Sequence, residues 1–162
     1  MQFDWGQEWD KEKEYLPILF EPPIEAWPET VAGYERNSLA DKYPLTLFQE
    51  HTKWRSHSAF GYNQWIRELD PEPCVYLHPV DAEQRGIVTG DAVRVFNDHG
   101  SVILRGRINP GVRKGSINIP KGWQTGQFIE GHYQRLTHRK HNPVCENSVF
   151  YDILIDVEKV EE

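Results

Sequence analysis

The sequence predicts one mainly β domain that closes, or nearly closes, into a β-barrel. From residue 43 onward the apolar runs are short, and turn residues recur at intervals of roughly 8 to 12 residues, which is typical of small barrels. Only two brief segments have helical character. With 162 residues, of which 38% are hydrophobic, the chain is long enough for one domain with a real core and too short for two large ones.

The expected strands are short apolar or alternating runs bounded by turn residues. They comprise residues 45–48, 74–77, 91–96, 101–108, 116–119 and 150–157. The strongest local signal is the tetrapeptide Asn97-Asp98-His99-Gly100, because valine and leucine alternate with polar residues on both sides of it. This pattern predicts a β-hairpin.

Two short helices are expected outside the barrel. Residues 62–69 place Trp65, Ile66 and Leu69 on one side of the first helix. In the second, we expect Asp81 to act as the N-cap and Gln84 to complete a capping box. A glycine at position 86 then predicts the end of this helix.

Residues 1–42 form an acidic segment that contains ten acids, four bases and four prolines. We expect an extended arm or linker here, followed by the barrel at residues 43–157 and a short tail at residues 158–162. The arm also carries several aromatic residues, which favour packing across another surface over full disorder.

Several classes of protein are not favoured. The sequence has no run of about 18 apolar residues and no signal-peptide pattern at its start, so we expect no membrane span. The compartment stays open between a prokaryotic cytoplasm and the periplasm. Only Cys74 and Cys145 are present, and the spacing of His132, His138, His141 and Cys145 matches no common zinc pattern, so we expect neither a disulfide framework nor a metal site.

Two polar features predict a bound ligand. The loop at residues 49–58 follows a predicted strand and carries two histidines, a lysine, an arginine, an amide and three hydroxyls, which exceeds what a turn requires. Residues 99–141 hold eight lysines and arginines against the single acid Glu130. Such a local excess of positive charge favours an anionic ligand. A solvated basic face without a partner is the alternative.

The order of these segments resembles the C-terminal molybdopterin-dinucleotide-binding domain of the dimethyl-sulfoxide-reductase family of molybdenum and tungsten oxidoreductases. The motifs that carry the resemblance are Tyr43-Pro-Leu-Thr-Leu-Phe, Arg55-Ser-His-Ser, His78-Pro-Val-Asp-Ala, Gly90-Asp-Ala-Val-Arg-Val, Pro110-Gly-Val, Gly122-Trp, Leu136-Thr and Asn142-Pro. The resemblance implies a double-psi β-barrel. It also implies a share in binding a bis(molybdopterin guanine dinucleotide) cofactor, with molybdenum or tungsten, for two-electron and often oxygen-atom transfer in anaerobic respiration.

The resemblance also implies the cofactor contacts. They are Gln49, His51, Arg55, His57, Ser58, Gln134 and Tyr151. Gln134 stands where relatives often have Asn, and Tyr151 stands where some have Lys. We further expect the side chains of the 49–58 loop to point away from the strand core, so that Arg55 would matter for the cofactor and little for stability.

A single barrel cannot enclose two dinucleotides, so the chain is expected to be part of a larger oxidoreductase and inactive alone, with no catalytic residue of its own. Its partners would be the remaining domains of the catalytic subunit and an electron-transfer iron–sulfur subunit, and no nucleic acid. The alternatives are a separate barrel subunit like that of formylmethanofuran dehydrogenases, a double-psi adaptor module that binds proteins, and a small self-contained decarboxylase. The polar loop at residues 49–58 disfavours the adaptor, and the absence of an assignable base disfavours the decarboxylase.

Overall fold

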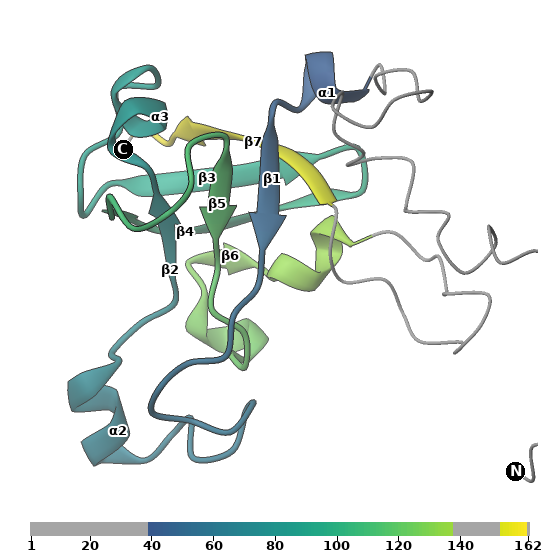
Figure 1. Ribbon diagram of the computed structural model, residues 1–162. Helices are drawn as coiled ribbons and strands as arrows, with labels where there is room; N and C mark the ends of the chain where they lie inside the picture. The colour runs from purple at the N-terminus through teal and green to yellow at the C-terminus, as the bar shows by residue number, and fades with distance from the viewer. Residues whose placement is uncertain (1–38, 138–152, 162) are drawn as a thin grey trace, which may run out of the picture.

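A computed structural model of the chain describes residues 39–137 and 153–161. The described part is mainly β, with short helices outside the sheet (Figure 1). The strands are β1 (Leu45–Phe48), β2 (Cys74–Leu77), β3 (Ala92–Asn97), β4 (Gly100–Ile108), β5 (Ser116–Asn118), β6 (Glu130–Gly131) and β7 (Ile153–Lys159). The helices are α1 (Leu39–Lys42), α2 (Gln64–Leu69) and α3 (Pro79–Glu83), with single 3-10 turns η2 (Thr125–Gln127) and η3 (Tyr133–Leu136).

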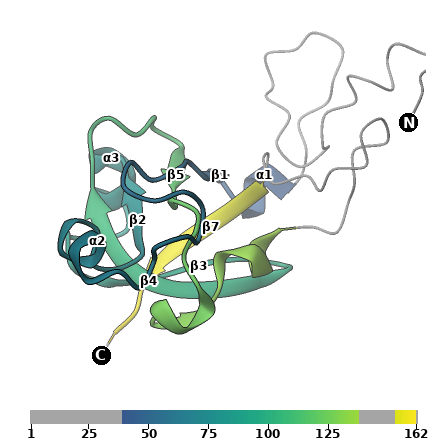
Figure 2. The same ribbon diagram turned by 90° about the horizontal axis from the view of Figure 1, so that it is seen from below.

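Six strands close into a barrel. Around the ring, β1 pairs with β5, β5 with β2, β2 with β4, β4 with β3, β3 with β7, and β7 again with β1. The β1–β5 and β2–β4 pairs are parallel and the other four are antiparallel. Figure 2 shows the strands of the ring from below. The expected double-psi β-barrel is confirmed.

The core fills the inside of this ring. Alternating residues of the strands point inward, as the burial of Leu45 and Leu47 in β1 and of Val93 and Val95 in β3 shows. The hairpin predicted around Asn97 is confirmed, with Val95 opposite Val102 in β4. Buried apolar side chains from all six barrel strands join in one cluster, which includes Trp123 and Leu136 from outside the ring.

The predicted cap of α3 is wrong. The N-cap is His78, three residues before the expected one, and the helix begins at Pro79. His78 Nδ1 accepts from the Val80 N–H at 3.1 Å. Proline is favoured at the first helical position because its fixed φ suits the helix. It also has no backbone N–H that would need a hydrogen-bond acceptor there. Asp81 is buried instead, and its carboxylate accepts from the Gly115 N–H at 2.8 Å.

The other predicted helix, α2, ends at Leu69 as expected but starts two residues later than expected, at Gln64. Asn63 caps it by accepting from the N–H groups of Trp65 and Ile66. Trp65 and Leu69 nevertheless remain exposed. Figure 1 shows α2 at the end of the molecule remote from α1, attached to the barrel by the segments that precede and follow it.

The 3-10 turn η3 is held against the hairpin. The side-chain amide of Asn97 donates to the Leu136 carbonyl at 2.8 Å and to the Leu154 carbonyl at 3.2 Å. One amide therefore joins the end of β3, the end of η3 and β7. The residues of η3 reach the candidate site from this fixed position.

Candidate functional site

The parallel pairing of β1 with β5 brings together two segments that are far apart in the sequence. Both strands leave the barrel at the same edge, and backbone hydrogen bonds continue beyond their ends. The Ile119 N–H donates to the Phe48 carbonyl at 3.0 Å, and the Lys121 N–H donates to the Glu50 carbonyl at 2.9 Å. The segment that holds Gln49 therefore lies beside the one that holds Lys121.

A glycine lets the loop at residues 49–58 return to the same edge. Gly122 has φ +97°, and a Cβ at this position would lie 2.1 Å from the His57 carbonyl oxygen. Only a residue without a side chain allows two backbones to approach so closely in this conformation. His57 is itself left-handed, with φ 52°. The contact fixes the His57-Ser58 dipeptide against the Lys121 segment.

Arg55 is buried below this edge, contrary to the expectation that the loop side chains point outward. Its side chain is 1% exposed and forms an ion pair with Asp70 at 3.0 Å, at the end of α2. It also donates to the Gly122 carbonyl at 3.1 Å, and its guanidinium carbon lies 3.7 Å from the centre of the Trp123 ring. Because these contacts join the loop, α2 and the segment after β5, Arg55 has a structural function that the sequence did not reveal.

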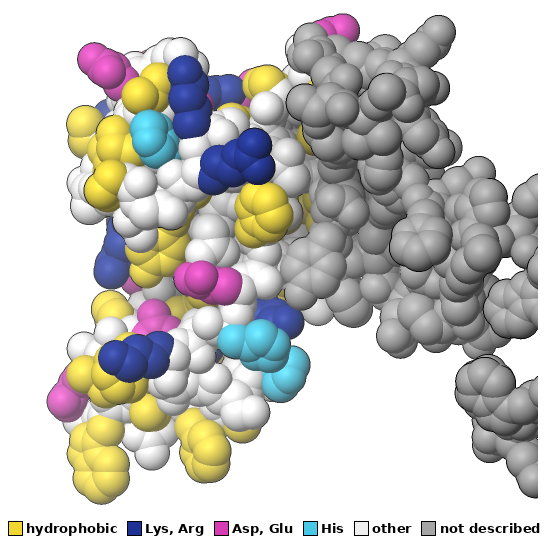
Figure 3. All heavy atoms as spheres, in the orientation of Figure 1, with side chains coloured by type: hydrophobic (Ala, Val, Ile, Leu, Met, Phe, Trp, Pro, Cys, Tyr) yellow, Lys and Arg dark blue, Asp and Glu magenta, His cyan; other side chains and the backbone are white. Residues whose placement is uncertain are grey.

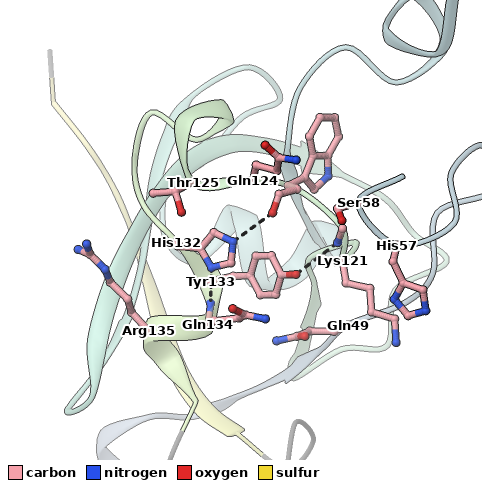
Figure 4. Close-up of a pocket in the computed structure, with 12 residues that line it drawn as sticks. Gln49, His57, Ser58, Lys121, Gln124, Thr125, His132, Tyr133, Gln134 and Arg135 are labelled. Atoms are coloured by element: carbon pink, nitrogen blue, oxygen red, sulfur yellow. Dashed lines mark hydrogen bonds between the residues drawn. The ribbon is translucent and has the colours of Figure 1, made fainter. Parts of the chain in front are cut away.

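His132 and Tyr133 form the centre of the site. The Gln134 N–H donates to His132 Nδ1 at 3.2 Å, so this nitrogen is the unprotonated one and Nε2 carries the hydrogen that faces the Trp123 carbonyl at 3.1 Å. The two rings stack with their centres 4.4 Å apart. The Tyr133 hydroxyl accepts from the Gly122 N–H at 3.3 Å. Figure 4 shows both rings between the Lys121 side and the Arg135 side of the site.

These segments surround a pocket of about 700 Å³. It is lined by Gln49, His57, Ser58, Lys121, Gly122, Trp123, Gln124, Thr125, His132, Tyr133, Gln134 and Arg135. Among these lining residues, Lys121 and Arg135 carry full positive charges and none is Asp or Glu. The pocket therefore combines amides, hydroxyls and imidazoles with a net positive charge, which suits a ligand with both amide-like edges and anionic groups.

The structure brings together four of the seven residues expected at the site, namely Gln49, His57, Ser58 and Gln134. His51 stands beside the pocket, with its ring centre 4.8 Å from that of His57 in a T-shaped arrangement. Arg55 lies behind the pocket wall, as described above. Tyr151 is outside the described residues.

Seven lining side chains were not individually predicted. They are Lys121, Trp123, Gln124, Thr125, His132, Tyr133 and Arg135. The excess of positive charge in residues 99–141 was the one available signal, and it includes both cations of the pocket. Nothing in the local sequence shows that Lys121 meets Gln49, because their proximity depends on the pairing of β1 with β5.

His51 is held in its neutral form more strongly than a free histidine. Desolvation lowers its pKa below the ordinary 6.5, and the electrostatic effects of Lys121 and His57 lower the pKa further. An uncharged His51 can both donate and accept a hydrogen bond at neutral pH.

Comparison with known proteins identifies the family of the chain. Residues 45–153 match the family described as "Molydopterin dinucleotide binding domain". The chain belongs to this family. The match runs from the first barrel strand to the start of the last and includes the described residues of the pocket.

Relatives of this molybdopterin dinucleotide-binding domain are much longer proteins. One, from Halobacterium salinarum, is a putative catalytic subunit of dimethyl sulfoxide reductase, 42% identical over 118 residues that make up 73% of this chain and 14% of the relative. Another is the dimethyl sulfoxide reductase DmsA of Escherichia coli, 31% identical over 85% of this chain and 18% of the relative. The chain therefore corresponds to less than a fifth of the length of these two relatives.

A solved structure supports the fold. The acetylene hydratase from Pelobacter acetylenicus superposes with a TM-score of 0.67 and 24% sequence identity, over 76% of this chain and 19% of that one. At this identity the likeness concerns the barrel alone.

The residues of the pocket fit the cofactor of the family, a molybdopterin guanine dinucleotide. Gln49 is 8% exposed, and its Nε2 finds no hydrogen-bond partner among the described residues. A buried donor without a partner costs free energy, and an acceptor on a bound ligand would remove that cost. Lys121 and Arg135 can face the phosphates, and the amide of Gln134 can pair with an amide-like edge.

The described residues were also considered for metal-binding clusters and membrane-spanning helices. In residues 39–137 and 153–161, no cluster of three or more His, Cys, Asp or Glu could hold a metal ion. Within the same ranges, no helix has the length and apolar character needed to cross a bilayer.

Proposed function

We propose that this domain holds one part of a bis(molybdopterin guanine dinucleotide) cofactor in the pocket between the Lys121 segment and η3. The observation that carries the proposal is the buried, unpartnered amide of Gln49 at the wall of an acid-free pocket. The cofactor itself supplies two-electron chemistry, often with transfer of an oxygen atom. The residues of this chain bind and orient it.

Each group has a role that follows from its chemistry. The amides of Gln49 and Gln134 and the hydroxyl of Ser58 pair with donors and acceptors of the cofactor rings. Lys121 and Arg135 form charge-assisted hydrogen bonds with the phosphates and compensate their negative charge. His57 donates from its ring, and its contact with His51 fixes the direction of that ring.

We propose that the domain acts as the C-terminal part of a catalytic subunit like those of dimethyl sulfoxide reductases, together with further domains and an iron–sulfur subunit that supplies electrons. The relatives support a place in a catalytic subunit, since one is named as a putative catalytic subunit of dimethyl sulfoxide reductase. Both relatives are several times longer than this chain. The pocket supports it too, because an open pocket on one barrel covers only one side of a large cofactor.

The test measures cofactor content in the complete subunit. Gln49→Leu and Lys121→Gln each remove one proposed contact, and Gln84→Leu and Lys114→Gln make the same chemical changes at exposed positions outside the pocket. Loss of one such hydrogen bond should weaken retention roughly tenfold. Pterin is quantified by its fluorescence after oxidative release. Equal pterin content in all four variants would refute the assignment of this pocket.

A further inference from the structure

Four large hydrophobic side chains in and before α2 are exposed to solvent. They are Phe60 (69% exposed), Tyr62 (61%), Trp65 (76%) and Leu69 (57%), and we call them the α2 apolar surface. Scattered exposed hydrophobic residues are normal, but four within ten positions mark a site of protein contact. Figure 3 shows hydrophobic atoms gathered at the end of the molecule that α2 occupies.

This surface is held in a defined conformation. Asn63 caps the first turn of α2, and Asp70 at its other end is paired with the buried Arg55. The Gln127 side chain donates to the Gly61 carbonyl at 3.2 Å, which ties the segment before α2 to η2. A rigid apolar surface loses little entropy when a partner binds, so these contacts prepare it for docking.

Phe60 adds evidence that the exposure has a function. It has φ +63°, a left-handed conformation that is rare for a bulky aromatic residue and costs about 1 to 2 kcal/mol. Strain of this kind persists only where the surrounding structure holds the residue in place, and it is concentrated at functional sites. Here it fixes an aromatic ring that lies mostly in solvent.

The α2 apolar surface and the cofactor pocket are joined through the chain. His57 and Ser58 line the pocket, and Phe60 and Tyr62 follow Ser58 within four residues. Whatever covers the open side of the pocket must approach this same end of the barrel. Because the relatives contain this domain as less than a fifth of their length, most of such a subunit is available to do so.

We infer that the α2 apolar surface is where the domain docks onto the remainder of its catalytic subunit, against a complementary apolar surface of the domains that cover the cofactor. This inference rests on the proposed function. The polar residues Arg67 and Glu68, exposed on the same helix, form a rim to the contact. Docking on this surface positions the pocket wall, since Arg55 links α2 to Gly122.

The test expresses the chain and the remainder of the catalytic subunit as separate polypeptides and measures their association. Trp65→Ala combined with Leu69→Ala should weaken binding roughly tenfold or more, as expected for apolar residues central to an interface. Val88→Ala removes a side chain that is 58% exposed and lies beyond α3, and it should leave binding unchanged. Unfolding temperatures of the variant chains should match that of the wild type, because the changed residues are exposed.

Several results would overturn the inference. The double variant could bind the remainder of the subunit as tightly as the wild-type chain does, or the wild-type chain could fail to bind it. The chain could also associate with itself through this surface, in which case the double variant would abolish self-association. Hydroxyl-radical labelling provides an independent measurement. Trp65 should react in the lone chain and be protected in the intact subunit, and protection already present in the lone chain would mean that the chain covers this surface itself. If the double variant binds the remainder of the subunit as the wild type does and the complex has normal pterin content, the docking surface is rejected. The proposed function then stands.

Discussion

The guanidinium of Arg55 stacks on the indole of Trp123, with its central carbon 3.7 Å from the ring centre. The same guanidinium pairs with Asp70 and donates to the carbonyl of Gly122. Trp123 is 4% exposed, so the stacked pair lies mainly in the packed interior, where Trp123 forms part of the pocket wall. The arginine of the loop thereby holds the wall of the pocket in place from behind.

Arg55→Ala should therefore destabilise the domain by roughly 3 kcal/mol. Removing one partner of a buried ion pair leaves the other uncompensated, and partial exposure of Asp70 places the effect at the lower end of the usual range. Chemical denaturation of the chain measures the change, with the exposed Arg67→Ala as the control. A change in the free energy of unfolding below about 0.5 kcal/mol would contradict the structural role and indicate that Arg55 behaves as a surface residue.

Gly122→Ala should distort the pocket. The new Cβ would meet the His57 carbonyl, and the left-handed backbone adds strain for any residue with a side chain. We expect a loss of at least about 2 kcal/mol in the free energy of unfolding. Gly126→Ala is the matched control, since a Cβ there meets open space, and it should be tolerated. Equal stability of the two variants would show that the close approach of the two backbones is not required.

The pKa of His51 should lie below 6.5 in the folded chain and rise when Lys121 is changed to Gln, because one of the neighbouring positive charges is then absent. Below pH 6.5 the unfolded chain takes up this proton more readily than the folded one. The free energy of unfolding is therefore unaffected by this group above pH 6.5, and it decreases as the pH drops towards the pKa of the folded chain. NMR titration of the His51 ring measures both variants, with Lys53→Gln as the control. A His51 pKa at or above 6.5 in the wild-type chain would contradict the prediction.

Cys74 should resist alkylation in the folded protein. Burial raises the pKa of its thiol to about 11, so the reactive thiolate is scarce at pH 8. Peptide mapping after iodoacetamide treatment distinguishes Cys74 from Cys145. Cys74 should be labelled only after unfolding, and rapid labelling in the native state would show that β2 opens readily.

Much of the fold could be predicted because it depends on local patterns. Alternating residues such as Val93 and Val95 show which side of a strand faces the core, and the Asn97 to Gly100 turn identifies the hairpin. The cap of α3 was misplaced because Asp81 is a good cap in isolation, whereas Pro79 and His78 together define an earlier start.

The site could be predicted only in part. The loop at residues 49–58 and the basic stretch were visible as polar composition. Their meeting depends on β1 pairing with β5, a long-range contact that no local pattern encodes. The same limitation explains Arg55, whose partners Asp70, Gly122 and Trp123 come from two other segments of the chain.

The most direct test of the central claim is a structure of the complete catalytic subunit with its cofactor bound. The Gln49 amide should then donate to a cofactor atom at about 2.7 to 3.2 Å, with Lys121 facing its phosphates or ring edges. The presently unpartnered Nε2 would thereby be satisfied. A cofactor seated on another face of the barrel, with Gln49 bonded only to protein, would contradict the account.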